Sequence, residues 1–93
     1  MRPKFSVDFN EFISNDNILL SKEDKKMDVD GNLILLKEGL EIDIFEIDYD
    51  DENNRDDIFA SGYIVNCQHL NEQGVKWCCH INNNGIKHQS KMK

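Results

Sequence analysis

No hydrophobic run in this 93-residue chain approaches the roughly 20 apolar residues that a membrane-spanning helix needs. The N-terminus opens with basic residues but has no apolar stretch behind them, so we expect no secretory signal peptide. Only three cysteines are present, two of them adjacent, and this number does not suit a disulfide framework. These absences predict one reduced, cytoplasmic domain that does not associate with membranes.

The chain also lacks the motifs that mark common enzyme classes. It contains no Gly-x-Ser-x-Gly elbow, no His-Glu-x-x-His pair and no phosphate-binding loop. A nucleophilic thiol at Cys78 or Cys79 would need an electropositive pocket, which cysteines in the middle of a strand rarely have. The histidines that would serve such a thiol as a base are His69, His80 and His88. We therefore expect no catalytic activity.

Positive charge is scarce and unevenly placed. The chain carries 11 Lys and Arg against 18 Asp and Glu, which gives a net charge of -7. Ten carboxylates fall between Glu38 and Asp57, and Arg55 is the one base among them, so this segment alone has a net charge of -9. Such a field attracts cationic partners and repels a nucleic-acid backbone. We expect a basic protein partner and no nucleic-acid ligand.

From Gly31 onwards, the apolar residues predict short β-strands joined by turns. Leu40 to Ile44 and Val75 to Ile81 alternate apolar and polar residues, as strands with one buried face do. Gly62 interrupts another strand, at a point where the backbone bends or a second segment approaches closely. The five expected strands cover Leu33–Leu36, Leu40–Ile44, Ile58–Asn66, Val75–Ile81 and Ile86–His88.

The N-terminal residues carry two competing patterns. Phe5, Phe9 and Phe12 recur at helical spacing, and Asp8 with Glu11 three residues later is typical of a capping box. We therefore expect a helix over about 8–14. Alternation over 5–9 indicates a strand instead.

Together these elements predict a mainly β protein. We expect residues 1–30 to form an N-terminal extension with a short helical or irregular segment, 31–88 a small antiparallel five-stranded SH3-like barrel, and 89–93 a polar tail. Barrel closure would remove the exposed edges of so short a sheet. An OB-like barrel or a curled meander is the alternative.

The order of five segments carries a family resemblance. They are Glu38-Gly39, the acidic stretch after it, Ala60–Val65, Val75–Ile81 and Gly85-Ile86. This order, over about the last two thirds of the chain, resembles small uncharacterised bacterial proteins of SH3-like barrel type. The resemblance implies the barrel fold and implies no activity.

Cysteine and histidine recur on two strands that we expect to be neighbours. Thiolate and imidazole are the ligands that zinc prefers, so a zinc site would form if four of these side chains shared one face. The alternation instead places Cys79 in the core beside Trp77, and Cys78 on the solvent-facing side with His80. A small zinc-binding domain is therefore our alternative function, and no other cofactor is expected. Its candidate ligands are Cys67, His69, Cys78 and His80.

The acidic stretch from Asp48 to Asp57 does not match a calcium-binding EF-hand loop. Asn53 and Phe59 stand where that loop requires Gly and Glu, and in Asp28–Asn32 the Gly comes too early. We expect the acidic stretch to be a solvated loop that serves recognition. The favoured function is a non-catalytic module, monomer or homodimer, that binds a basic protein, and inhibition of that protein is one form such binding could take. The candidate partner-binding residues are Glu46, Asp48, Tyr49, Asp50, Asp51, Glu52, Asp56 and Asp57.

Overall fold

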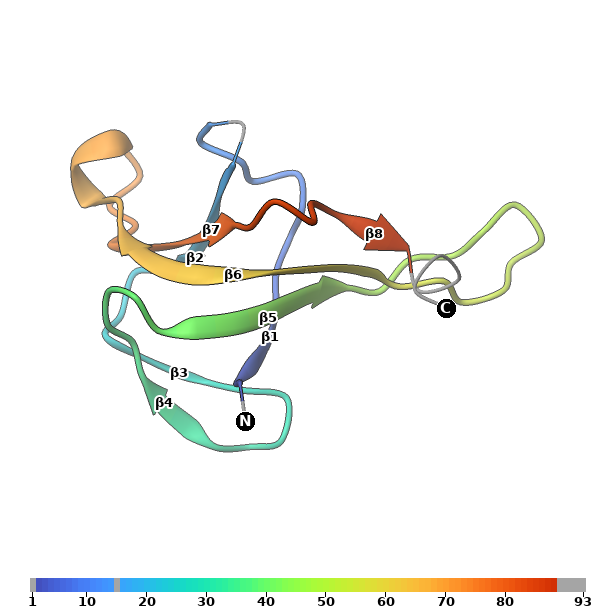
Figure 1. Ribbon diagram of the computed structural model, residues 1–93, viewed down its shortest axis with the longest axis horizontal. Helices are drawn as coiled ribbons and strands as arrows, with labels where there is room; N and C mark the ends of the chain where they lie inside the picture. Colours follow the sequence, from blue (N-terminus) through green and yellow to red (C-terminus); the bar gives the residue numbers. More distant parts are fainter. Residues whose placement is uncertain (1, 15, 89–93) are drawn as a thin grey trace.

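The computed structural model describes residues 2–14 and 16–88, and the polar tail expected over 89–93 lies outside them. Within the described residues the protein is mainly β, as predicted (Figure 1). One short 3-10 helix, η1 (Gln68–Leu70), accompanies the strands. The strands are β1 (Lys4–Ser6), β2 (Asn17–Ser21), β3 (Lys25–Met27), β4 (Leu33–Leu35), β5 (Glu41–Glu46), β6 (Ile58–Asn66), β7 (Trp77–Ile81) and β8 (Lys87–His88).

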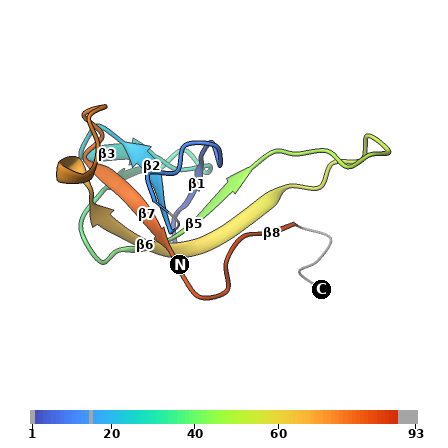
Figure 2. The same cartoon turned by 90° about the horizontal axis from the view of Figure 1, so that it is seen from above.

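Six of these strands form one curled, half-barrel sheet. Its order is β1-β5-β6-β7-β2, and β8 pairs with the beginning of β6 (Figures 1 and 2). β1 runs parallel to β5, and the other pairs are antiparallel. The prediction of five antiparallel strands was therefore wrong in strand number and in direction. The arrangement is not clearly that of an SH3-like barrel.

The helix expected over 8–14 is absent from the described residues. Asp8 forms a single turn, in which its side chain accepts the N–H of Asn10 and its carbonyl accepts the N–H of Glu11. Beyond that turn the chain pairs with β2, through a bridge between Phe12 and Ile18 and a bond from the N–H of Leu19 to the carbonyl of Glu11. Strand pairing has overridden the helical spacing of the phenylalanines.

The described residues before residue 31 contribute two strands, β1 and β2, to the main sheet. β1 lies at one end of the strand order, beside β5, and β2 lies at the other end, beside β7. The side chain of Phe5 is fully buried against the main core, and Ile18 and Leu20 are buried with it. β1 and β2, from the segment expected to be an extension, therefore pair and pack with the strands of the main sheet.

Apolar clusters cover both faces of the sheet near β7. Trp77 and Cys79 point into the main core, as predicted. Cys78 points to the other face, where it is fully buried with Leu19 and Val75. The expectation that Cys78 faces solvent was therefore wrong, because the segment between β6 and β7 covers that end of the sheet.

Gly62 lies where β6 meets β7, and the close approach predicted there is confirmed. A Cβ at this position would overlap the carbonyl oxygen of His80 on the neighbouring strand. Only glycine allows the two backbones to pack at this separation.

β3 and β4 form a separate two-stranded hairpin below the main sheet in Figure 1. Its turn is set by Asp28, whose carboxylate oxygen accepts the N–H groups of Asp30 and Asn32, and by Gly31, whose φ is 87°. β3 lies before the first of the five strands that we expected, within the segment expected to be an N-terminal extension.

Candidate functional site

The acidic stretch forms a protruding hairpin. We call residues 47–57, between β5 and β6, the acidic arm; both views show the arm extending well beyond the sheet (Figures 1 and 2). Tyr49 pairs with Arg55 across it. The N–H of Asp56 donates to the carbonyl of Asp48 at 2.8 Å, and that of Asp50 to the carbonyl of Asn54 at 2.8 Å. The solvated loop that we expected is therefore held by backbone pairing.

A tight turn closes the tip of the acidic arm. One carboxylate oxygen of Asp50 accepts the N–H groups of Glu52 and Asn54, both at 2.9 Å. Asn53 supplies the left-handed backbone conformation, with a φ of 66°, that Asn tolerates better than most residues. Asp50 is thus a structural residue of the arm as well as a candidate binding residue.

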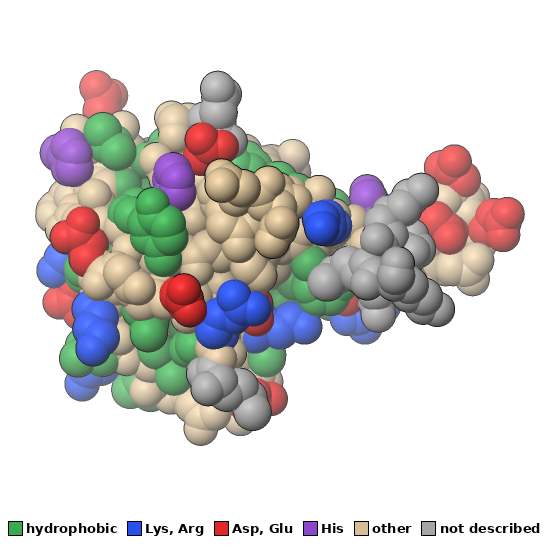
Figure 3. Space-filling model, viewed as in Figure 1, with side chains coloured by type: hydrophobic (Ala, Val, Ile, Leu, Met, Phe, Trp, Pro, Cys, Tyr) green, Lys and Arg blue, Asp and Glu red, His purple; other side chains and the backbone are tan. Residues whose placement is uncertain are grey.

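The tip presents carboxylates beside exposed apolar groups. Asp51 and Glu52 are exposed, and Figure 3 shows acidic side chains gathered at the end of the acidic arm. Tyr49 is 59% exposed and Ile47 is 50% exposed. Sequence reasoning missed Ile47, although its alternation with Tyr49 could have identified it. No ion pair joins Asp48, Asp51 or Glu52 to a cation among residues 2–14 and 16–88.

Charged side chains at the base of the arm form contacts that stabilise the fold. Arg55 makes a two-pronged bond to Asp57, with Nε 2.9 Å from Oδ1 and Nη2 3.0 Å from Oδ2. Asp57 is only 6% exposed, and the hydrogen bonds from Arg55 lower the pKa of its carboxyl. Glu46 accepts the N–H of Phe9, and Asp56 lies 3.7 Å from His88. Glu46 and Asp57 therefore stabilise the fold, which leaves the tip as the accessible part.

The four candidate zinc ligands do not converge. Cys67 and Cys78 form a disulfide across a Cα separation of 5.9 Å, contrary to the expectation that the cysteines are unpaired. His69 is exposed on η1, and His80 lies 2.8 Å from the side-chain oxygen of Asn17. In the part of the chain that the structure describes, no group of three or more His, Cys, Asp or Glu could hold a metal ion.

The remaining cysteine is unsuited to nucleophilic chemistry. Cys79 is fully buried in the main core. Burial, and secondly the charge of Asp43, raises the pKa of its thiol to about 12. A thiol with such a pKa remains protonated at neutral pH, so it is a poor nucleophile.

Several aromatic side chains lie on the outer face of the main sheet. Lys4 places its ammonium 4.9 Å from the ring centre of Phe45 and 4.6 Å from that of Phe59. Tyr63 stacks against His80, with ring centres 5.1 Å apart. The ammonium group of Lys4 therefore covers the ring of Phe45. Tyr63 stays partly exposed, and Trp77 is in the core as predicted.

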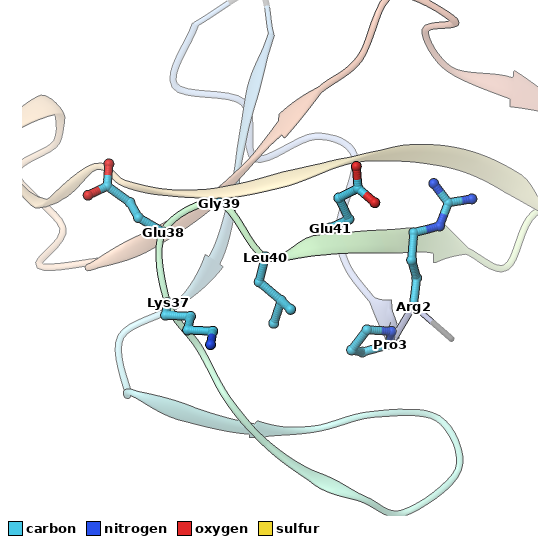
Figure 4. Close-up of a pocket in the computed structure, with 7 residues that line it drawn as sticks. All are labelled: Arg2, Pro3, Lys37, Glu38, Gly39, Leu40 and Glu41. Carbon is cyan, nitrogen blue, oxygen red and sulfur yellow. The ribbon is translucent and has the colours of Figure 1, made fainter.

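A wide hollow of about 770 Å³ lies between the β3–β4 hairpin and the start of β5 (Figure 4). Lys37, Leu40 and Pro3 point into it, whereas Glu38 points away and Arg2 runs beside Glu41. Its lining mixes single apolar groups with charges of both signs on exposed side chains. We assign no ligand to this hollow, because no set of buried polar groups is directed into it.

The described residues contain no helix long and apolar enough to cross a membrane. Comparisons of the chain with protein-family models, with curated proteins and with solved structures found no match. The acidic arm therefore stands as the candidate site on its own geometry.

Proposed function

We propose that this protein is a non-catalytic interaction module whose acidic arm binds a basic protein partner and inhibits it. One observation carries the proposal. The arm stands away from the sheet on a hydrogen-bonded hairpin. Its tip carries the exposed carboxylates of Asp51 and Glu52, and the exposed ring of Tyr49 lies just before the turn.

The charges of the arm favour encounter with a cationic surface. Asp57 already neutralises Arg55, so this base does little to offset the carboxylates at the tip. Carboxylates on a protruding scaffold raise the rate at which a basic partner associates, and they disfavour acidic surfaces. The tip can approach a Lys- or Arg-rich surface without the sheet intervening.

The apolar groups of the arm provide contact area that charges alone would not. Tyrosine is enriched among the residues that dominate binding energy, particularly where surrounding contacts exclude water. Tyr49 and Ile47 lie two residues apart on a paired strand, so both project to the same side of the arm. We expect Tyr49 to enter a pocket on the partner while the carboxylates meet its rim.

The proposal is tested by capture from a lysate of cells that produce the protein, with three immobilised forms. The native chain is compared with an arm variant carrying Asp48→Asn, Asp51→Asn and Glu52→Gln, which keeps the turn residue Asp50 and the Arg55–Asp57 pair. The control carries Glu23→Gln, Glu38→Gln and Glu72→Gln, which removes the same charge from exposed positions off the arm.

We expect one basic protein to be retained by the native chain and by the control, and to be lost from the arm variant. This protein is then purified and its activity is measured with each form added. Equal retention on the arm variant, or equal loss from the control, would show that the arm is not the binding face. A retained protein whose activity is unchanged would remove the inhibitory part of the proposal.

The role of Tyr49 is tested separately from that of charge. Tyr49→Ala leaves every carboxylate of the arm in place and should weaken binding of the captured partner by about 2 kcal/mol, or about 30-fold in Kd. Tyr63→Ala, a partly exposed tyrosine on the sheet, is the control and should leave Kd unchanged. Titration calorimetry measures both; an unchanged Kd for Tyr49→Ala would leave electrostatics as the only contribution of the arm.

A further inference from the structure

The outer edge of β4 has unpaired backbone groups. The N–H of Asp28 donates to the carbonyl of Asn32, and the N–H of Leu36 donates to that of Asp24. These bonds fix the alternation of the β3–β4 ladder, in which Ile34 directs its N–H and C=O groups towards β3. The N–H and C=O groups of Leu33 and Leu35 therefore point outwards, and no backbone partner for them occurs among residues 2–14 and 16–88.

One face of the β3–β4 hairpin carries apolar side chains that are unusually exposed. Leu33 and Met27 are each 61% exposed, and Leu35 is 59% exposed. In the register of the hairpin, Leu33 faces Met27 and Leu35 faces Lys25, so these side chains share one face. Ile34 lies on the opposite face and packs against the main core. An exposed apolar edge strand of this kind readily pairs with another strand.

We propose that the β4 edges of two copies of this chain pair antiparallel about Ile34 and form a closed dimer with a continuous four-stranded sheet. In this register Leu33 of each copy lies opposite Leu35 of the other. Each such pair exchanges two N–H···O=C bonds, so the outward groups of both strands are satisfied by four bonds. The interface is two-fold symmetric and closes on itself.

A second copy is assigned to this edge because both its backbone groups and its exposed leucines match under two-fold symmetry. The free donors and acceptors lie one residue before and one residue after Ile34, so the pattern is unchanged when the strand is turned end for end. Any extended strand offers this backbone spacing, and a second copy adds matching side chains: in this register each exposed leucine of one copy lies opposite an exposed leucine of the other, on the same face of the sheet.

Charge at the two ends of β4 favours the same arrangement. Asp30 precedes the strand and Lys37 follows it. Antiparallel pairing brings the basic end of each copy to the acidic turn of the other. Figure 4 shows Lys37 pointing to the hairpin side of the chain and Glu38 pointing away from it.

Sedimentation equilibrium from micromolar to millimolar concentration tests the dimer. The native protein should rise from the 10.9 kDa chain mass to twice that value. Leu35→Pro removes one outward N–H and leaves the bonds to β3 intact, because proline is tolerated on a strand edge that faces solvent. We expect this variant to remain a monomer, whereas Leu35→Ala keeps the N–H and should still dimerise.

Amide hydrogen exchange in the native protein tests the register independently of any variant. The amides of Leu33 and Leu35 should become protected as the concentration rises through the dimerisation range, while that of Ile34 is protected throughout. A protein that stays monomeric at millimolar concentration overturns the proposal. A dimer in which Leu33 and Leu35 exchange freely also overturns it, because the contact would then lie elsewhere. Neither result bears on partner binding by the acidic arm.

Discussion

At the scale of single residues, the contact between Trp77 and Asp24 joins the main core to the segment before β3. The indole Nε1–H donates to Asp24 at 3.0 Å, and Nζ of Lys76 lies 2.8 Å from the same carboxylate oxygen. The hydrogen bond from Lys76, and next that from Trp77, lowers the pKa of Asp24 below its ordinary value of 3.8. The ionised carboxylate therefore contributes to stability.

This contact predicts a specific loss of stability in acid. Because the folded pKa of Asp24 lies below the unfolded value, the contribution is present above about pH 4 and is lost as the pH falls through the folded pKa. Urea unfolding followed by Trp77 fluorescence measures it at successive pH values. Asp24→Asn should be less stable at pH 7 and should lose less stability on acidification. Parallel losses in both proteins would contradict the assignment.

Gly62 permits the close contact between β6 and β7. In Gly62→Ala the new methyl group would overlap the carbonyl oxygen of His80, so one of the two strands must move. Overpacking of this kind costs about 1 to 3 kcal/mol. The free energy of unfolding in urea tests this, and Gly31→Ala, which has open space but a φ of 87°, separates a steric cost from a backbone cost. A change below a few tenths of a kcal/mol in Gly62→Ala would show that the strands can separate freely.

At the scale of elements, the disulfide holds the segment between β6 and β7 against the sheet. Cys67 and Cys78 are 11 positions apart and are buried together with Leu19 and Val75. Closing a loop of this length restricts the unfolded chain and stabilises the fold by about 3 kcal/mol in the chain-entropy account. Disulfides are typical of oxidising compartments, whereas the small number of cysteines led us to expect a reducing one.

Removing the disulfide should therefore lower the thermal stability measurably. The double variant Cys67→Ser with Cys78→Ser is expected to melt about 10 °C or more below the native protein. A reducing agent should lower the Tm of the native protein by a similar amount and leave the double variant unchanged. A native Tm that does not respond to reductant would indicate that the two thiols are not bonded in solution.

The sequence predicted those elements whose pairing has a local signature. Alternation of apolar and polar residues identified β5 and β7. The pairing of β1 with β5 could not be predicted, because it joins Phe5 to Ile44 and no local pattern records so distant a partner. The phenylalanine spacing is compatible with a helix when it is taken alone, and only burial against the sheet decides otherwise.

The exposure of the acidic stretch was predicted, but its hairpin structure was not. High acidity correctly indicated exposure over residues 50–52, yet exposure does not imply a lack of pairing. A local signal was available, because the same turn occurs three times in the chain. Its first residue is Asp28, Asp50 or Asn71, and the side chain of that residue accepts the N–H groups of the residues two and four positions later. The residue three positions later is Gly or Asn in the left-handed backbone conformation. Comparison of Asp28–Asn32 with Asp50–Asn54 would have indicated a hairpin turn at the tip.

At the scale of the whole molecule, the two proposed surfaces lie apart. The acidic arm projects from one end, and the β3–β4 hairpin lies below the opposite half of the sheet (Figure 1). A dimer formed through β4 would leave both arms free. Two arms on one particle would increase the apparent affinity for a partner with two basic surfaces, without any new contact.

Hydrogen exchange of the native protein, with and without the captured basic partner, shows which surface the partner covers. We predict that binding protects the amides of the acidic arm, over residues 47–55, and leaves the amides of β6 and β7 near Tyr63 and His80 unaffected. Protection confined to the outer face of the sheet or to the β3–β4 hairpin, with unchanged exchange in the arm, would show that the arm does not bind the partner and serves only solubility.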